Sequence, residues 1–298
     1  MQDTRRTGSG KMSLLKLPRA LTIAGFDPSG GAGVLADART FAAFGFQAVA
    51  VITSLTFQNT ARVFGAVHQT GDTVRAQLKP LLEDDGIACT KTGMLPTRDV
   101  VLEVARLFRE TDLPRPVVDP VILSSSGRRL MEETALDVLT RELLPLARLV
   151  TPNIPEAETL TGTTITSEAD MRRAAVTIRE LGARAVLIKG GHLGEQKAEG
   201  RRQKAEGGRL EPETVKTEDE SDEAIDVLDN EGKVTVFRES RVHDSELHGS
   251  GCMLSAAIAA GLGKGMTLED SVGAAKSFVL EAIRNSAPRL KWQMKTDK

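Results

Sequence analysis

The chain has 298 residues, of which 40% are hydrophobic and 27% charged, a composition typical of a folded domain and unlike a small disulfide-stabilised protein. Lysine and arginine number 39 against 41 aspartate and glutamate, a formal net charge of −2. The positive excess that nucleic-acid binding requires is missing, so we expect no nucleic-acid partner. The two cysteines are too few for a disulfide framework or a cysteine metal cluster, which favours a cytoplasmic protein. No apolar run approaches the roughly 18 to 20 residues of a membrane helix, so we expect no membrane partner.

The hydrophobic pattern predicts strands that alternate with helices. The first strand signal, at 21–25, is followed by a glycine-rich turn at 27–33 and by a helical run to Phe44. Further strands are predicted at 47–55, 66–68, 87–92, 116–122, 149–152 and 185–189, with helical patterns in the intervals. Because such alternation is typical of a parallel sheet covered by helices on both faces, we expect an α/β fold with ligands at the carboxyl ends of the strands.

One segment breaks this pattern. Residues 195–223 hold sixteen charged and four apolar residues, and the pentapeptide Gln-Lys-Ala-Glu-Gly occurs twice within them. We interpret this segment as a disordered insertion, because it cannot bury enough apolar surface to fold. After it, strands at 224–228 and 233–237 flank a turn composition that predicts a hairpin, and two helices complete the chain. We therefore expect a flexible leader at 1–20 and a single domain at 21–290.

The turn at 31–36 fits the G-x-G-x-x-A form of a dinucleotide-binding loop. A dinucleotide site of that kind also has an acidic residue about 20 positions later, at the end of the second strand. No aspartate or glutamate occurs from Ala38 through Gly71. A dehydrogenase is therefore a weak hypothesis.

Small residues from His248 to Cys252 begin a predicted helix and form the strongest single candidate site. The backbone N–H groups at such a helix start have no intrahelical partner and, with the helix dipole, form a socket for phosphoryl oxygens or a developing negative charge. A thiol in the first turn experiences the same field, which we expect to lower the pKa of Cys252 so that it acts as a base. The alternative is that Cys252 is a small packing residue, the role that we assign to Cys89.

Eight sequence blocks in one order resemble a single enzyme family. The blocks are TIAGFDPSGGAG at 22–33, Asp37, QNT at 58–60, KTGM at 91–94, VDPV at 118–121, TPNIPE at 151–156, KGGH at 189–192 and HGSGC at 248–252. Together they resemble the hydroxymethylpyrimidine/phosphomethylpyrimidine kinases of thiamine biosynthesis, within the ribokinase-like superfamily. The resemblance spans about residues 21–285 and is far more specific than any one block.

The resemblance implies a three-layer αβα ribokinase-like fold with a mostly parallel central sheet. It also implies ATP-dependent phosphorylation of the 5-hydroxymethyl group of 4-amino-5-hydroxymethyl-2-methylpyrimidine, and then of the resulting monophosphate to the diphosphate, by a cytoplasmic homodimer. Phosphoryl transfer requires positioning, cations around the phosphates and donors that face the transferred group. The residues of the eight blocks supply each of these.

The resemblance also assigns the residues that handle phosphate and metal. The catalytic set is Gly249, Ser250, Gly251, Cys252 and Lys189. The turn would hold the transferred phosphoryl group, with Cys252 at the base position that an aspartate fills in most sugar kinases of the superfamily. Lys189, Asn153 and Glu156 would bind ATP, with Lys189 neutralising phosphate charge. Asp119 and Glu156 would organise Mg²⁺ largely through water, as a hard cation of that size prefers.

For the pyrimidine, the resemblance points to five residues. These are Gln58, Asp37, Gly25, Met94 and Val121. The amide of Gln58 presents both a donor and an acceptor and so matches a ring nitrogen beside an exocyclic amine. Met94 and Val121 would pack on the ring. Without the surrounding blocks, Met94 and Val121 would be interpreted as ordinary core and Asp37 as a solvated helix residue.

Two other functions stay open at this point. A pyridoxine or pyridoxal kinase of the same superfamily carries the same cysteine-type turn and accepts a hydroxymethyl group on a similar flat ring, although Gln58 favours the pyrimidine. A catalytically silent pyrimidine-binding protein would keep the fold without turnover. The silent protein is disfavoured by the complete set of positions Asn153, Glu156, Lys189 and Cys252. Phe26 stands where the family usually has a small or hydroxylated residue, which we expect to reshape the pocket wall.

Overall fold

The computed structural model describes residues 17–59, 62–84, 86–124, 127–191, 223–240 and 248–286. Within these ranges, nine strands form one sheet in the order β3-β2-β1-β4-β5-β6-β7-β8-β9. The strands are β1 (Arg19–Phe26), β2 (Gln47–Gln58), β3 (Val63–His68), β4 (Ile87–Thr92), β5 (Val117–Val118), β6 (Leu149–Val150), β7 (Ala185–Gly190), β8 (Glu223–Asn230) and β9 (Lys233–Ser240). Each predicted strand therefore has its counterpart in the sheet.

The centre of the sheet is parallel and both of its edges are antiparallel. β1 pairs in parallel with β2 and β4, and parallel pairing continues from β4 to β7. β3 is antiparallel to β2, while β8 is antiparallel to both β7 and β9. The predicted mostly parallel sheet is thus confirmed, and the predicted hairpin is formed by β8 and β9 around a two-residue turn at 231–232.

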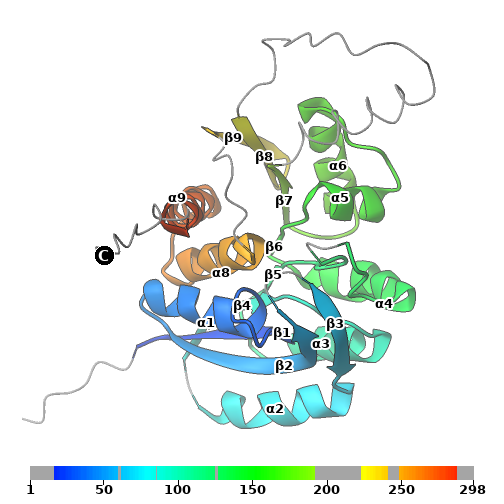
Figure 1. Cartoon of the computed structure of the whole chain (residues 1–298), viewed down its shortest axis with the longest axis vertical. Coiled ribbons are helices and arrows are strands. Elements are labelled where there is room, and N and C mark those ends of the chain that lie inside the picture. The colour runs from blue at the N-terminus through cyan, green and yellow to red at the C-terminus, as the bar shows by residue number, and fades with distance from the viewer. Residues whose placement is uncertain are drawn as a thin grey trace, which may run out of the picture.

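Helices cover both faces of this sheet. They are α1 (Gly33–Ala43), α2 (Gly71–Glu83), α3 (Arg98–Glu110), α4 (Glu133–Val138), α5 (Ile154–Thr161), α6 (Glu168–Glu180), α8 (Ser250–Gly263) and α9 (Leu268–Ser286), with a π-helical turn at Leu139–Leu143 and a 3₁₀ turn at Leu144–Leu146. Figure 1 shows α1, α8 and α9 on one side of the sheet and α2 to α6 on the other. Neighbouring strand residues point to opposite cores, since Leu187 joins the α1–α8–α9 side and Val186 the other. The architecture is the three-layer αβα arrangement.

β5 and β6 are each two residues long, shorter than the predicted strands 116–122 and 149–152. Proline has no N–H to donate to a strand ladder, and Pro120 and Pro152 follow these strands closely. The ladders therefore end early. As a result Asp119 lies directly beyond the carboxyl end of β5.

The predicted leader and insertion lie mostly outside the described residues, which begin at 17 and omit 192–222. Of the predicted leader at 1–20, Arg19 and Ala20 belong to β1. Of the predicted insertion at 195–223, Glu223 begins β8. Among the described helices, none is both long and apolar enough to cross a membrane.

Candidate active site

The sequence motifs meet at the carboxyl edge of the sheet. The loops that follow β1, β4, β5, β6 and β7 lie at this edge, because these strands are parallel. α8 begins at the same edge: a Cβ atom at Gly249 would lie 2.0 Å from the carbonyl oxygen of Gly31. Gly249 also has a φ of 83°, so both space and backbone conformation require glycine there. The predicted phosphoryl turn therefore contacts the glycine-rich turn directly.

Asp27 connects the glycine-rich turn to two other parts of the site. Its carboxylate accepts hydrogen bonds from the N–H groups of Ser29 (2.8 Å) and Ala32 (2.9 Å). It also bonds the side chain of Gln58 and lies 3.1 Å from Nε2 of His248. Burial raises the pKa of Asp27, but the hydrogen bonds outweigh burial and hold the pKa below its ordinary value. An ionised Asp27 therefore fixes Gln58 relative to the start of α8.

The start of α8 presents the backbone donors that the predicted phosphoryl socket requires. The first intrahelical hydrogen bond at this end runs from the N–H of Met253 to the carbonyl of Gly249 at 3.0 Å, and the N–H groups of 250–252 precede it. The amine of Lys189 lies beside them, 3.3 Å from the position that a Cβ of Gly251 would take. The predicted turn and the predicted cation are thus neighbours.

Lys189 is held in place by Asp119. Its Nζ lies 3.1 Å from Oδ1 of Asp119, and the hydroxyls of Thr151 and Ser255 donate to the same carboxylate at 3.3 and 3.4 Å. Burial lowers the pKa of Lys189, but the charges of Asp119 and Glu156 outweigh burial and raise it. Burial likewise raises the pKa of Asp119, and the charge of Lys189 is the chief cause that lowers it overall. The result is a fixed ammonium–carboxylate pair at the turn.

Asn153 and Glu156 form a capping box at the start of α5. Each side chain accepts a hydrogen bond from the backbone N–H of the other residue at 2.9 Å. The second carboxylate oxygen of Glu156 accepts the N–H of Ile122 at 3.3 Å. Burial raises the pKa of Glu156, and the charge of Lys189 offsets burial only in part. Within the part of the chain that the structure describes, no group of three or more His, Cys, Asp and Glu side chains is arranged to hold a metal ion.

The residues predicted to pack on the ring lie beyond β4 and β5. Met94 is 7% exposed, and its sulfur would lie 3.1 Å from a Cβ atom at Gly25, so a larger residue at position 25 would displace Met94. Val121 has a φ of 34°, in the left-handed region. A β-branched residue adopts this region only under strain of about 1 to 3 kcal/mol. Backbone strain of this kind gathers at binding sites, although the ring contact itself stays a prediction.

Asp37 and Lys91 form an ion pair that is sealed from solvent. Nζ of Lys91 lies 2.8 and 3.0 Å from the two carboxylate oxygens of Asp37, and the hydroxyl of Thr22 donates to Asp37 at 2.6 Å. Both charged side chains are 0% exposed. The interpretation of Asp37 as a solvated residue is therefore wrong, while its substrate contact stays a prediction. No role for Lys91 follows from the motifs, yet a lysine inside a predicted core strand is itself a signal, because lysine is almost never fully buried unless paired.

The pKa of Cys252 is shifted in the direction opposite to the predicted one. Cys252 lies in the first turn of α8 and is half-buried. Desolvation is the largest cause and raises the pKa of its thiol to about 11. The charge of Lys91 and the N–H of Gly33 lower the pKa, whereas Asp119 and Asp37 raise it. Enclosure outweighs the helix terminus, so the thiol is protonated at neutral pH.

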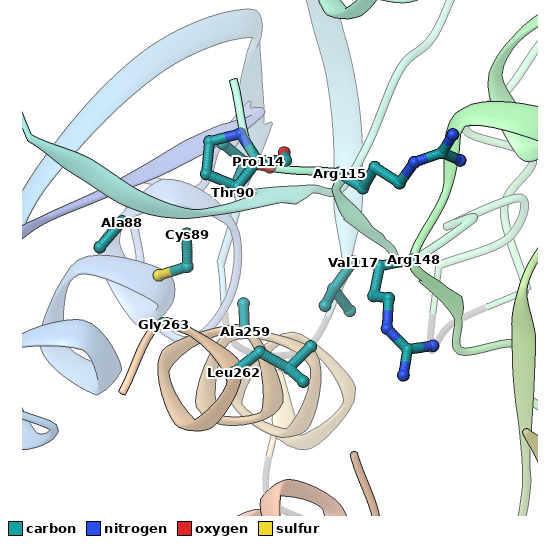
Figure 2. A pocket seen from close by; sticks show the side chains of 10 residues that line it. All are labelled: Ala88, Cys89, Thr90, Pro114, Arg115, Val117, Arg148, Ala259, Leu262 and Gly263. Atoms are coloured by element: carbon teal, nitrogen blue, oxygen red, sulfur yellow. The ribbon is translucent and has the colours of Figure 1, made fainter. Parts of the chain in front are cut away.

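A pocket of about 220 Å³ lies at the other end of the sheet (Figure 2). It is lined by Ala88, Cys89, Thr90, Pro114, Arg115, Val117, Arg148, Ala259, Leu262 and Gly263. These residues come from the first half of β4, the amino ends of β5 and β6 and the last turns of α8, so the pocket is separate from the motifs. Burial raises the pKa of the Cys89 thiol to about 12, which agrees with the packing role predicted for it.

Comparison with known sequences points to one family. A family model described as phosphomethylpyrimidine kinase matches residues 27–297. A hydroxymethylpyrimidine/phosphomethylpyrimidine kinase of Streptomyces coelicolor is 37% identical over 271 residues, which are 91% of this chain and 90% of the relative. A kinase of the same name from Aquifex aeolicus is 38% identical over 267 residues, 90% of this chain and 94% of the relative.

Solved structures of two kinase groups share the fold. The phosphomethylpyrimidine kinase of Clostridium difficile 630 superposes with a TM-score of 0.70 at 34% identity, covering 89% of this chain and 99% of that chain. An ADP complex of Bacillus subtilis pyridoxal kinase superposes with a TM-score of 0.75 at 33% identity, covering 91% and 93%. The expected ribokinase-like fold is therefore confirmed.

Proposed function

Because the chain belongs to the phosphomethylpyrimidine kinase family, we propose that it uses ATP to phosphorylate 4-amino-5-hydroxymethyl-2-methylpyrimidine and then the resulting monophosphate, in thiamine biosynthesis. One observation carries the proposal: the Asp27 carboxylate bonds both Gln58 and His248, the residue that precedes the phosphoryl turn. The residue proposed to recognise the ring and the turn proposed to bind the phosphoryl group are thus linked through one carboxylate. Such proximity is what transfer to a substituent of the ring requires.

In the first transfer, the 5-hydroxymethyl oxygen attacks the γ-phosphorus of ATP, the bond from that phosphorus to the β–γ bridging oxygen breaks, and ADP leaves. The hydroxyl proton passes to the thiolate of Cys252. The N–H groups of 250–252 and the amine of Lys189 would face the oxygens of the transferred group. Because burial raises the pKa of the thiol to about 11, the thiolate is the minor form, and its small population would limit this step.

The second transfer needs no base. Its acceptor is a phosphate oxygen, which already carries negative charge at neutral pH because the second pKa of a phosphate monoester is about 6. Lys189 and the turn would serve both transfers, whereas Cys252 would take a proton only in the first. The two reactions of one enzyme therefore depend differently on the same thiol.

The acidic residues fit a magnesium ion that keeps most of its water. One oxygen of Asp119 is bonded by Lys189 and Thr151, and both oxygens of Glu156 accept backbone N–H groups. Few lone pairs are left for direct ligation, and Mg²⁺ typically binds one or two carboxylates, substrate phosphates and several waters. Asp119 and Glu156 would hold that hydrated ion, with Asn153 beside it. Bound Mg²⁺ would supply charge neutralisation at the β- and γ-phosphates.

A steady-state ATP assay tests the proposal, with the pyrimidine alcohol, its monophosphate and pyridoxal measured side by side. We expect kcat/KM for the pyrimidine alcohol to exceed that for pyridoxal by about 100-fold, because the donor and acceptor of the Gln58 amide match an aminopyrimidine edge. The reverse order would favour a pyridoxal kinase, the second candidate, which the likeness to the Bacillus subtilis enzyme supports. Pyrimidine binding without any ATP turnover would favour the silent binding protein.

We further propose a homodimer in the cytoplasm. Four apolar side chains at the β2–β3 edge of the sheet are exposed, and an apolar patch of this kind is typical of an interface. They are Leu55, Phe57, Phe64 and Val67. Both cysteines are free, as expected for a reducing compartment. Sedimentation equilibrium tests the dimer, and a monomer at micromolar concentration would contradict it.

A further inference from the structure

The thiol of Cys252 and a sealed lysine ammonium both contact the beginning of α1. The backbone N–H of Gly33, the first residue of α1, hydrogen-bonds to Cys252. Asp37, four residues later on the same helix, binds the ammonium of Lys91. The thiol of Cys252 and the ammonium of Lys91 are therefore both anchored within the first two turns of α1.

The ammonium of Lys91 is placed to act through its field and not by contact with substrate. Its side chain is 0% exposed. The absence of a side chain at Gly93 makes room for it, since a Cβ there would lie 2.9 Å from Nζ of Lys91 and 3.0 Å from Cβ of Ala24. Burial lowers the pKa of Lys91, but the negative charge of Asp37 leads the causes that raise it above its ordinary value. Lys91 is therefore charged throughout the working range of pH.

Four charged groups surround Cys252 on the elements packed around the start of α8. Lys91 comes from β4 and Lys189 from β7, while Asp37 comes from α1 and Asp119 follows β5. Among the causes that act on the thiol, Lys91 is the largest that favours the thiolate, and the two aspartates disfavour it. Lys189 lies at the turn, where bound phosphates would neutralise its charge. Of the two lysines, Lys91 is therefore the one whose charge would still act on the thiol.

We propose that Lys91 is a positioning residue that stabilises the thiolate of Cys252, and that Asp37 limits this effect by neutralising part of the Lys91 charge. The inference deepens the proposed function by naming the residues that set the acidity of Cys252, the proposed base. Only the expected change in kcat/KM rests on the proposed function. The electrostatic part stands on the arrangement of Lys91, Asp37 and Cys252 alone.

The acidity of the thiol can be measured without kinase activity. Cys89 and Cys252 are the only cysteines of the chain, so Cys89→Ala leaves one thiol. The rate of its alkylation by iodoacetamide in metal-free buffer reports the thiolate fraction. At pH 9 we expect Lys91→Met to lower this rate about tenfold, equivalent to one unit of pKa, and Asp37→Asn to raise it about threefold. Loosened packing would speed alkylation in both variants, so opposite signs separate the field from a structural effect.

Two further variants serve as a matched control and as a safeguard against misfolding. Lys276→Met removes another buried lysine from its pair with Asp226, which joins α9 to β8. This matched control should leave the alkylation rate within about twofold. The double variant Lys91→Met/Asp37→Asn removes both charges without leaving an unpaired ion, and remains informative where Lys91→Met alone does not fold. Its rate should fall between those of the parent and Lys91→Met, because the charge of Lys91 acts on the thiol more strongly than that of Asp37.

The proposal is overturned if Lys91→Met or Lys91→Met/Asp37→Asn is alkylated as fast as the parent or faster while Lys276→Met is unchanged. Where the expected order of rates holds, kcat/KM for the pyrimidine alcohol should fall in parallel with alkylation, while kcat/KM for the monophosphate should change less than about threefold. The expected order of alkylation rates in a protein that turns over none of the tested acceptors would support the electrostatic inference and contradict the proposed function.

Discussion

Two lysine–carboxylate pairs flank Cys252, and they differ in exposure. In the first pair, Lys91 and Asp37 are both 0% exposed; in the second, Lys189 is 16% exposed and Asp119 4%. The nitrogen–oxygen distances are similar, 2.8 and 3.1 Å, so the chemistry of the pairs is the same. The position of each lysine relative to the turn at 249–252 decides which groups it can reach. Lys189 can touch a phosphate, whereas Lys91 can act only on the groups around it.

Lys189→Met sharpens this comparison most. We expect kcat to fall about 10³-fold for the alcohol and for the monophosphate alike, because the variant removes a cation beside the transferred group in both reactions. Steady-state kinetics with both acceptors measure the effect, and circular dichroism checks that the sheet is intact. A fall of less than about tenfold would show that the backbone donors of α8 suffice without the cation.

Lys91→Met is expected to act on stability as well as on the thiol. The change leaves Asp37 buried without a counter-charge, which costs about 3 kcal/mol of the free energy of unfolding. Burial raises the pKa of Asp37 in the folded protein, so the unpaired carboxyl takes up a proton as pH falls and the loss shrinks towards pH 5. Urea titrations at pH 8 and pH 5 measure both effects. Equal losses at the two pH values would contradict an unpaired charge as the cause.

Cys252→Ser should separate the two transfers. A hydroxyl is far less acidic than a thiol, so we expect kcat/KM for the pyrimidine alcohol to fall about 100-fold. The monophosphate acceptor is already ionised, so its kcat/KM should stay within about threefold. The ratio of the two rates on one enzyme preparation is the measurement. A parallel loss in both transfers would assign Cys252 to phosphoryl binding and not to proton removal.

The pH profile tests the base role of Cys252 without any substitution. A base must be deprotonated to act, and the pKa of Cys252 is raised to about 11, so kcat/KM for the alcohol should climb about tenfold per unit between pH 7 and 9. The monophosphate reaction should stay nearly level over the same interval. Initial rates in buffers of matched ionic strength provide the profile. A level alcohol profile would remove Cys252 from the base role.

The fold followed from the sequence because its signals are local. Apolar β-branched runs and glycine turns predicted the alternation, and β4 agrees with the predicted 87–92 at both ends. β5 and β6 were predicted too long, since the apolar pattern continues through residues where Pro120 and Pro152 end the ladder.

The site was harder to predict because its controlling contacts are distant in the chain. Asp27 and His248 are 221 positions apart, and only the packed sheet brings them to 3.1 Å. The acidity of Cys252 was predicted in the wrong direction because a helix start is visible in a sequence, whereas the enclosure of a side chain is not. The sealed pair of Lys91 and Asp37 was missed for the same reason.

The contact between Gly249 and Gly31 joins two loops that the chain builds from opposite ends. A methyl group at Gly249 would press into the carbonyl of Gly31, and one at Gly31 would lie 2.2 Å from the ring of His248. Neither loop therefore has room for a side chain at this contact. A larger residue at either glycine would push the glycine-rich turn away from the start of α8 and separate Asp27 from His248.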